Sequence, residues 1–199
     1  MKVREVVAAI WAAFAAAVAG LLGLRRTGLK HPPLRPPGAS YITPGERDRR
    51  FGPIDWVPAA TSTNPEKVLL DRAPPLVRVP VPELAHVGIT SFRVHAKAAP
   101  SLNAVLRDLR RDGKMDLIRS YQGGYYPRLV RGSKASLSSH SYGTAIDLNA
   151  DENPLYTLGT PEQWELARYF REHGWYWGGW FGSRPDPHHF EFLGDTEWV

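Results

Sequence analysis

The 199-residue sequence contains no cysteine. This absence excludes a disulfide framework, a thiolate zinc site, an iron–sulfur cluster and a cysteine nucleophile. Any metal site must therefore be built from His, Asp and Glu, and seven histidines are available. Hydrophobic residues make up 43% and charged residues 23%, a composition that argues against a wholly disordered chain. The length is enough for one domain of about 100–150 residues with an appendage.

An excess of positive charge is also missing from the C-terminal part of the chain. From residue 85 onward there are 13 Lys and Arg residues and 13 Asp and Glu residues. The whole net charge of +5 comes from residues 25–50, where seven basic residues face two acidic ones. The basic residues are Arg25, Arg26, Lys30, Arg35, Arg47, Arg49 and Arg50, and the acidic ones are Glu46 and Asp48. We therefore expect no nucleic-acid partner, but an attraction of this basic segment to anionic lipid or envelope polymer.

One long uncharged run, residues 6–24, reads VVAAIWAAFAAAVAGLLGL. As a helix with a rise of about 1.5 Å per residue, it roughly matches a bilayer core of about 30 Å. We predict an uncleaved anchor that makes the membrane a partner and places the rest of the chain in the cell envelope, outside the cytoplasm. Ala17 and Ala19 also fit a cleavage site, in which case residues 1–19 are removed and the protein is secreted. A soluble alanine-rich helix is the third alternative.

Proline is concentrated in the next segment. Residues 31–83 carry twelve of the eighteen prolines, a density that disfavours helices and central strands. We expect an extended spacer, parts of which, such as residues 51–57, can pack onto a domain. The predicted organisation is an anchor or signal segment over residues 1–24, a basic and Pro-rich spacer over 25–84, and a domain over 85–199.

Residues 85–199 have the pattern of a mixed α+β domain. Alternation predicts strands at residues 89–95, 117–121, 144–149 and 188–193. A helix is expected from Pro100 to Gly113, with Leu102, Val105, Leu106 and Leu109 on its apolar face. A second helix begins at Thr160 as N-cap, with Gln163 completing a capping box, and ends at His173 and Gly174.

A histidine and an aspartate at the third predicted strand break the pattern of an ordinary core. Asp147 lies mid-strand between Ile146 and Leu148, where a carboxylate is costly to bury unless a positive group meets it. His140 lies on the preceding loop, which Gly143 allows to turn back. The two side chains could bind a divalent metal, or could form a hydrogen bond that ties the loop to the strand.

The last predicted strand supplies a second group of such residues. Alternation places His188 with Phe190 on the core side and His189 with Glu191 on the other side. His189 is therefore the better ligand, and His188 a packing or rim residue. Asp186, held between two prolines, can reach a metal-bound water without binding the metal. His140, Asp147 and His189 would leave one coordination position open, as in catalytic zinc sites.

The joint pattern Ser138-x-His140-x6-Asp147 followed by Asp186-x-x-His189-Phe190 resembles the zinc peptidases of the M15 family. These are D-alanyl-D-alanine carboxypeptidases and L-alanyl-D-glutamate endopeptidases of bacteria and phage lysins. Residues 124–133, 138–149 and 177–179 are similar to the phage-like branch of the family. The resemblance covers roughly residues 85–195.

This resemblance implies an α+β fold with a central antiparallel sheet and a Zn²⁺ ion held by His140, Asp147 and His189. It implies hydrolysis of peptide bonds in peptidoglycan stem peptides, with Asp186 as the general base that takes a proton from water and passes it to the leaving amine. Many members have Glu at this position and the endopeptidase branch has Asp, so Asp186 favours an endopeptidase without deciding.

The expected substrate contacts depart from the family in one respect. Members often carry a substrate-facing arginine in a Ser-Gly-Tyr-Arg motif, but this chain has Ser120-Tyr121-Gln122 near that place. We expect Arg128 or Arg131 to take this role and to stabilise the oxyanion with the zinc. We also expect Ser138, Tyr142 and Trp177 to contact the substrate.

Two alternatives belong to other functional classes. A catalytically inactive envelope-binding module could keep the same fold, but all three expected ligands and the base are present. A nuclease or other hydrolase could use the same two histidines and two aspartates, but the domain has no basic patch.

Overall fold

The computed structural model describes residues 30–60 and 62–194. The uncharged run at residues 6–24, with its predicted anchor or signal, lies outside these ranges. Within them, no helix combines the length and the apolar character needed to cross a membrane.

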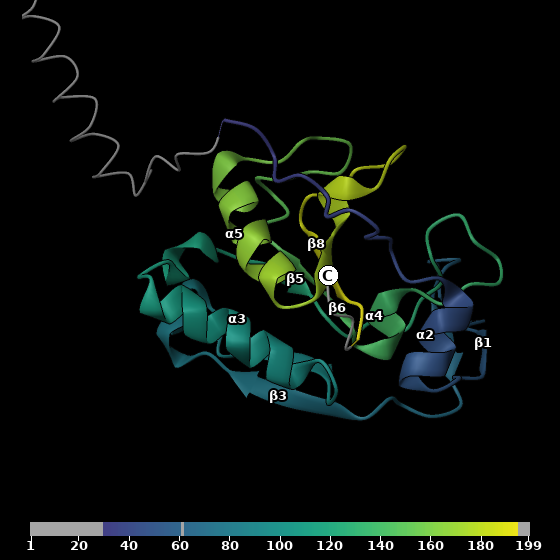
Figure 1. Cartoon of the computed structure of the whole chain (residues 1–199). Helices are drawn as coiled ribbons and strands as arrows, with labels where there is room; N and C mark the ends of the chain where they lie inside the picture. Colours follow the sequence, from purple (N-terminus) through teal and green to yellow (C-terminus); the bar gives the residue numbers. More distant parts are fainter. Residues whose placement is uncertain (1–29, 61, 195–199) are drawn as a thin grey trace, which may run out of the picture.

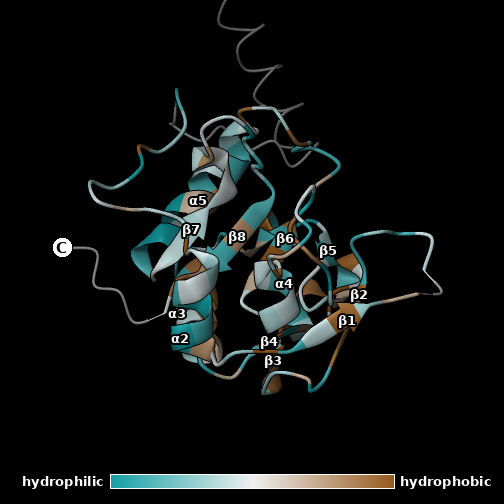
Figure 2. Ribbon diagram, turned by 90° about the vertical axis from the view of Figure 1, so that its right-hand side faces the viewer, coloured by the Kyte–Doolittle hydropathy of each residue, from teal (hydrophilic) through white to brown (hydrophobic). Residues whose placement is uncertain are grey.

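The central element is a four-stranded antiparallel sheet. Its strands are β5 (Tyr121–Gly123), β6 (Ala145–Leu148), β8 (His189–Phe192) and β7 (Trp175–Trp177), hydrogen-bonded in the order β5-β6-β8-β7 (Figure 2). The strands predicted at residues 144–149 and 188–193 are confirmed as β6 and β8. The pairing of β6 with β8 brings the third predicted strand next to the last one, at the centre of the sheet.

Both predicted helices are confirmed, and they lie side by side (Figure 1). Helix α3 (Ala99–Arg111) buries Leu102, Val105, Leu106 and Leu109 completely. Helix α5 (Pro161–Glu172) begins at Thr160, whose hydroxyl oxygen accepts a hydrogen bond from the Gln163 amide nitrogen at 3.2 Å. Their apolar faces share one core with the aromatic residues of the sheet.

Gln163 does not complete the predicted capping box. Its side chain is fully buried and donates hydrogen bonds to the carbonyl oxygens of Leu148 and Pro187. Its side-chain oxygen also accepts a hydrogen bond from Asn149 Nδ2. Buried carbonyl groups need such donors. The side chain therefore ties α5 to the end of β6 and to the loop before β8.

The Pro-rich segment differs most from expectation, because much of it is folded against the domain. It forms α2 (Pro44–Phe51), the hairpin β1 (Trp56–Pro58) with β2 (Val68–Leu70), and β3 (Leu76–Pro80), which pairs antiparallel with β4 (Ser91–His95). A short 3₁₀ helix, η1 (Pro82–Val87), follows. Proline is accepted at a helix start and in strands of small, open-edged sheets, so its density does not enforce a spacer.

Another difference concerns the predicted strand at residues 117–121. The chain there forms a 3₁₀ turn, η2 (Met115–Leu117), and β5 begins only at Tyr121. The amide nitrogens of Arg119 and Ser120 donate to the side-chain oxygen of Asn149 and not to a neighbouring strand. The side chain of Asn149 therefore replaces a strand ladder over these residues.

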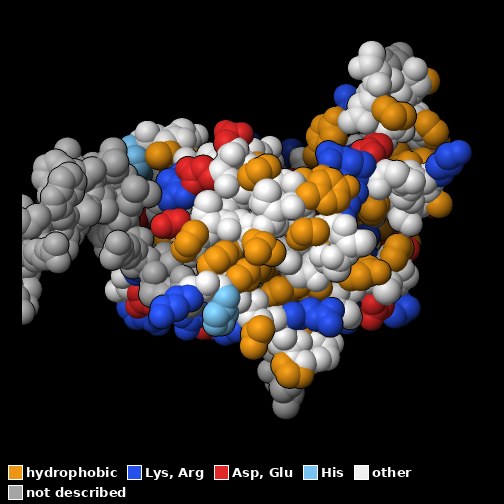
Figure 3. Space-filling view, turned by 90° about the horizontal axis from the view of Figure 1, so that it is seen from above, with side chains coloured by type: hydrophobic (Ala, Val, Ile, Leu, Met, Phe, Trp, Pro, Cys, Tyr) orange, Lys and Arg blue, Asp and Glu red, His pale blue; other side chains and the backbone are white. Residues whose placement is uncertain are grey.

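The remaining elements are α4 (Ser139–Tyr142) and the 3₁₀ turn η3 (Gly178–Trp180). The mixture of helices with small antiparallel sheets confirms the α+β fold class. On the face shown in Figure 3, Lys and Arg side chains are interspersed with Asp and Glu and do not gather into one broad patch.

Candidate metal centre

Three predicted ligands converge because of the register of β6 and β8. Asp147 of β6 lies directly opposite His189 of β8, so both side chains project from the same face of the sheet. His140 reaches this face from the one-turn helix α4, which Ser138 caps at its start and Gly143 ends in the left-handed conformation with φ 69°. Gly143 allows the sharp return into β6.

The ligand atoms of these side chains face one another at short range. The distance is 3.0 Å from His189 Nδ1 to Asp147 Oδ1, 3.3 Å from His140 Nε2 to Asp147 Oδ2, and 3.3 Å from His140 Nε2 to His189 Nδ1. Four tetrahedral ligands placed about 2.0–2.1 Å from a zinc ion lie about 3.3–3.4 Å from one another. The donor set and its spacing therefore fit a zinc ion.

The other ring nitrogen of each histidine has its own acceptor. His140 Nδ1 lies 2.6 Å from the carbonyl oxygen of Gly124, and His189 Nε2 lies 3.5 Å from Glu191 Oε2. Glu191 Oε2 also accepts a hydrogen bond of 2.5 Å from the Ser139 hydroxyl. Such outer partners fix the tautomer and orientation of a metal-binding histidine. They leave His140 Nε2 and His189 Nδ1 as the atoms available to a metal.

The pKa values of Asp147 and His189 show that the charged groups of the site act on one another. Burial raises the pKa of Asp147, but His140 and His189 lower it more, to far below its ordinary value. Burial lowers the pKa of His189, but hydrogen bonds to Asp147 and Glu191 and their charges raise it to about 10. These groups therefore favour a positive charge beside the Asp147 carboxylate, and binding of a metal there would be coupled to the release of protons.

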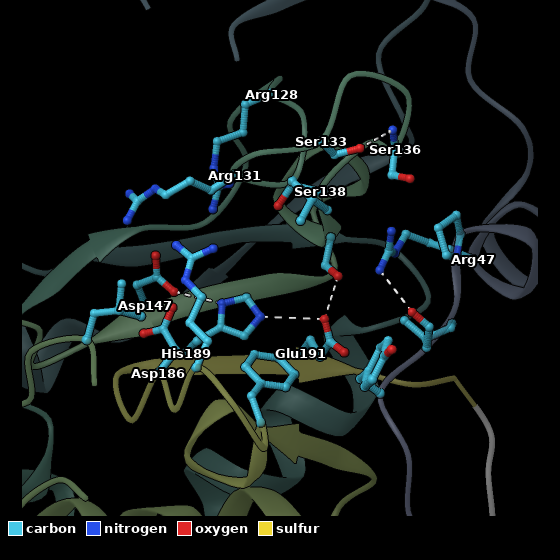
Figure 4. A pocket seen from close by; sticks show the side chains of 18 of the residues that line it. Arg47, Arg128, Arg131, Ser133, Ser136, Ser138, Asp147, Asp186, His189 and Glu191 are labelled. Carbon is cyan, nitrogen blue, oxygen red and sulfur yellow. Dashed lines mark hydrogen bonds and ion pairs between the residues drawn. The ribbon is translucent and has the colours of Figure 1, made fainter. Parts of the chain in front are cut away.

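Asp186 lies beside Asp147 and His189 (Figure 4), but it is not part of the triad. Its Oδ1 lies 2.8 Å from His188 Nε2, and His188 Nδ1 lies 2.8 Å from the carbonyl oxygen of Asn153. Burial raises the pKa of Asp186, but the hydrogen bond from His188 and the charges of His188 and His189 lower it below its ordinary value. His188 stays outside the triad, as predicted, and it is the partner of Asp186.

Gly178 allows the loop that carries Asp186 to approach β7 and η3. The Asp186 amide nitrogen donates to the Gly178 carbonyl oxygen at 2.9 Å. A Cβ at position 178 would lie 2.3 Å from the Asp186 carbonyl oxygen and 3.0 Å from the His189 Cβ. Only glycine therefore accommodates this approach.

Asp147, His189 and Asp186 line a pocket with a volume of about 610 Å³. Arg128, Arg131 and Ser138, three of the residues predicted to bind or stabilise the substrate, line it. Arg128 is half-buried, and burial lowers its pKa despite the opposing charges of Asp147, Glu66 and Asp186. Arg184, which the sequence analysis did not single out, lines the same pocket.

Tyr142 and Trp177 do not line the pocket and are packing residues. Tyr142 is 3% exposed and donates its hydroxyl hydrogen to Asp48. Trp177 is 1% exposed and donates its indole hydrogen to the Pro187 carbonyl oxygen at 2.7 Å. The structure thus places them behind the site, where they hold its loops, and not on its substrate side.

Two further residues of the pocket, Glu191 and Arg47, were not predicted from the sequence. Glu191 was placed on the face of His189 by alternation, and that was the available signal for its contact with the ring. Arg47 of α2 lines the pocket although it lies far upstream in the Pro-rich segment. No local pattern indicated its place.

Comparison with protein families identifies residues 131–192 as a match to the family described as D-alanyl-D-alanine carboxypeptidase, one of the M15 peptidases. Comparison with curated proteins and with solved structures finds no match. The matched segment contains His140, Asp147, Asp186 and His189, so the family match and the geometry concern the same site. At the level of the family, this segment is that of a hydrolase acting on peptide bonds. The M15 resemblance is thereby confirmed over residues 131–192, which match the model of this peptidase family.

Proposed function

We propose that this protein is a zinc metallopeptidase that hydrolyses peptide bonds in the stem peptides of bacterial peptidoglycan. The observation that carries the proposal is the convergence of His140 Nε2, His189 Nδ1 and the Asp147 carboxylate inside the segment that matches the M15 family. Both family activities remain candidates: removal of the terminal D-alanine, and cleavage between L-alanine and D-glutamate.

His140, Asp147 and His189 would hold the zinc ion, with a fourth position open to solvent. Zinc bound there would supply a Lewis acid and lower the pKa of a water toward about 7. The Gly124 carbonyl oxygen and Glu191 support the role of the two histidines, because each orients one imidazole ring from behind.

Asp186 would act as the general base and then as the general acid. Its lowered pKa keeps the carboxylate ionised at neutral pH, which is the form that accepts a proton from the attacking water. The proton would then pass from the Asp186 carboxyl to the leaving amine. The His188 ring, whose Nε2 lies 2.8 Å from Asp186 Oδ1, would hold the carboxylate in place during both transfers.

Arg128 and Arg131 would bind the substrate. Stem peptides carry carboxylates, and guanidinium groups recognise carboxylates and developing oxyanions through paired hydrogen bonds. Arg128 is the better candidate for the group nearest the scissile bond. It is half-buried, and the charges of Asp147 and Asp186 raise its pKa against the effect of burial. Arg131 is exposed and suits a more distant part of the peptide.

The location proposed for this chemistry is the cell envelope outside the cytoplasm, where peptidoglycan lies. The uncharged run at residues 6–24 would anchor the protein in the membrane, or direct its secretion if cleaved. The basic residues that follow would associate with anionic lipid or envelope polymer.

Digestion of purified muropeptides by the zinc-loaded protein tests the proposal. Mass spectrometry should detect either loss of one D-alanine or separation of L-alanine from the rest of the stem, and the product identifies the activity. Elemental analysis of the same sample should find close to one zinc per chain. Zinc without any product would favour the inactive envelope-binding module, and a chain without zinc would refute the metallopeptidase.

A further inference from the structure

Helix α4 carries His140 but is too short to be stable alone. It has four residues, a single turn, and isolated helices need about 12–15 residues to be even marginally stable in water. Its position must therefore come from its neighbours. At its C-terminal end, the Gly143 carbonyl oxygen accepts a hydrogen bond of 2.7 Å from the His95 amide nitrogen of β4.

The N-terminal end of α4 is held by α2, which lies next to it (Figure 1). Arg47 of α2 donates a hydrogen bond of 2.7 Å to the carbonyl oxygen of Leu137, one residue before the N-cap of α4. The Arg47 guanidinium also lies 5.7 Å from the ring centre of Tyr142, whose hydroxyl donates to Asp48. Two adjacent residues of α2 thus contact both ends of α4.

Helix α2 has the local features of a rigid support. Thr43 caps it and forms a complete capping box with Glu46, and Pro44 occupies its first turn. A second hydrogen bond from Arg47, of 3.1 Å, reaches the Ile42 carbonyl oxygen and ties the side chain to the start of its own helix. Arg47 is 5% exposed and therefore has little freedom to move.

Arg47 also acts on the second histidine through Glu191. Glu191 is 3% exposed, and its carboxylate lines the same pocket as the Arg47 guanidinium. In Figure 4, Glu191 lies between His189 and Arg47. A buried carboxylate needs a compensating positive charge, because burial without a partner is costly. Arg47 therefore supports the acceptor that orients the His189 ring.

We propose that Arg47, from outside the segment that matches the M15 family, is a positioning residue for the metal centre. It fixes α4, and with it His140, through the Leu137 carbonyl oxygen, and it stabilises the Glu191 carboxylate that orients His189. The catalytic unit of this chain accordingly begins upstream of residue 47. This inference rests on the proposed zinc site.

The test is the zinc affinity of the full chain, measured by competition with a chromophoric chelator. Arg47→Met keeps the length of the side chain but removes its charge and hydrogen bonds. Outer partners of metal ligands typically contribute 10–100-fold in affinity, so we expect zinc to bind about tenfold more weakly. Arg49→Met on the exposed side of the same helix is the matched control and should change the affinity less than about twofold.

A double-mutant cycle with Glu191→Gln separates positioning from a general loss of stability. If Arg47 acts through Glu191, then Arg47→Met should weaken zinc binding less in the Glu191→Gln chain than in the unchanged chain. Arg47→Lys, which keeps the charge, should bind zinc with an affinity between those of the unchanged chain and Arg47→Met, and it serves if Arg47→Met does not fold.

The outcomes separate this inference from the proposed function. If the unchanged chain binds zinc tightly while Arg47→Met and Arg49→Met bind it with equal affinity, this result would overturn the inference about Arg47 and leave the proposed zinc site standing. A lower thermal midpoint with unchanged zinc affinity would assign Arg47 to folding only and would also overturn the proposal. An unchanged chain that binds no zinc would overturn the proposed function and this inference together.

Discussion

Two of the three carboxylates that line the pocket, Asp147 and Asp186, differ in what surrounds them. Asp147 faces the rings of His140 and His189, whereas Asp186 faces His188. Replacing a group that binds a metal lowers the metal affinity, whereas replacing a group that accepts a proton lowers the turnover and leaves the metal bound. Substitutions at these two residues therefore distinguish their roles.

Asp186→Asn should keep about one zinc per chain and lose turnover by about 10²–10⁴-fold, because the amide cannot accept a proton. Asp147→Asn should weaken zinc binding itself, since an amide oxygen is a poorer ligand than a carboxylate. Zinc content by elemental analysis and turnover on muropeptides at neutral pH check both variants. If Asp186→Asn loses its zinc and Asp147→Asn keeps it, then Asp186 is the metal ligand and Asp147 is the general base.

His188→Ala should keep its zinc and alter the pH dependence of the reaction. His188 lowers the pKa of Asp186, so its removal raises that pKa. The base must be ionised to act, and the acidic limb of the profile of kcat/KM against pH should therefore move to higher pH. His86→Ala, at an exposed histidine outside the pocket, should leave the profile unchanged. An unmoved acidic limb in His188→Ala would contradict the coupling between His188 and the general base.

At the scale of single residues, strand alternation separated His188 from His189 and Asp147 from Ile146 and Leu148, because the side-chain period of a strand is fixed. The face shared by His189 and Asp147 follows from the pairing of β6 with β8. His140 lies on α4, and its position in the chain and the family pattern indicated it. It could not show that His188 turns back to Asp186, since this contact depends on the path of the loop through Pro187. The burial of Tyr142 and Trp177 depends on tertiary packing, so their motif positions did not reveal it.

Among the elements around the site, η3 and the loop before β8 approach most closely at Gly178. Gly178→Ala would force the Asp186 carbonyl oxygen away from a new Cβ at 2.3 Å. Because a displacement of about 1 Å can cost about 10²-fold in rate, we expect kcat/KM to fall by at least about tenfold. Kinetics on muropeptides, with zinc content measured in parallel, check the prediction.

Gly182→Ala is the matched control for Gly178→Ala. Gly182 lies in the loop that follows η3, and a Cβ there meets no atom within 4 Å. Its kcat/KM should stay within about twofold of the unchanged chain, as for most exposed positions. Equal losses in the two variants would mean that the whole loop resists substitution, and that the close approach at Gly178 has no special role.

The elements that the sequence predicted well are those with several turns of periodic pattern. Helices α3 and α5 have clear apolar faces, a proline in the first turn and a glycine beyond the end. Helix α4 is too short to show a period, and β7 is buried on both faces and shows no alternation. Strand β3 depends on pairing with β4, which no pattern in the Pro-rich segment indicates.

For the whole molecule, the main surprise is that the upstream segment belongs to the folded unit. Val79, Val81 and Leu84 are nearly inaccessible to solvent, and β3 is the strand paired with β4 in the part of the chain that the structure describes. A chain beginning at residue 85 would lack these side chains. It would also leave the backbone groups of β4 without their partners.

A chain beginning at residue 85 should therefore be much less stable than one beginning at residue 30. Burial of Val79 and Val81 alone contributes at least about 3 kcal/mol, at about 1.5–3 kcal/mol per side chain. Denaturant unfolding followed by tryptophan fluorescence should give a lower midpoint for the shorter chain, or no cooperative transition. Identical unfolding midpoints for the two chains would show that residues 25–84 act only as a spacer.

Strand β8 lies between β6 and β7 in the sheet although it follows both of them along the chain. A chain emerges from the ribosome with its N-terminal part first, so β6 and β7 are made before the strand that joins them. Until β8 is made, one edge of β6 is unpaired, and His189 is not yet present beside His140 and Asp147. The order of synthesis therefore keeps the three candidate ligands from meeting until β8 has been made. The pairing of β8 with β6 then completes both the sheet and the triad.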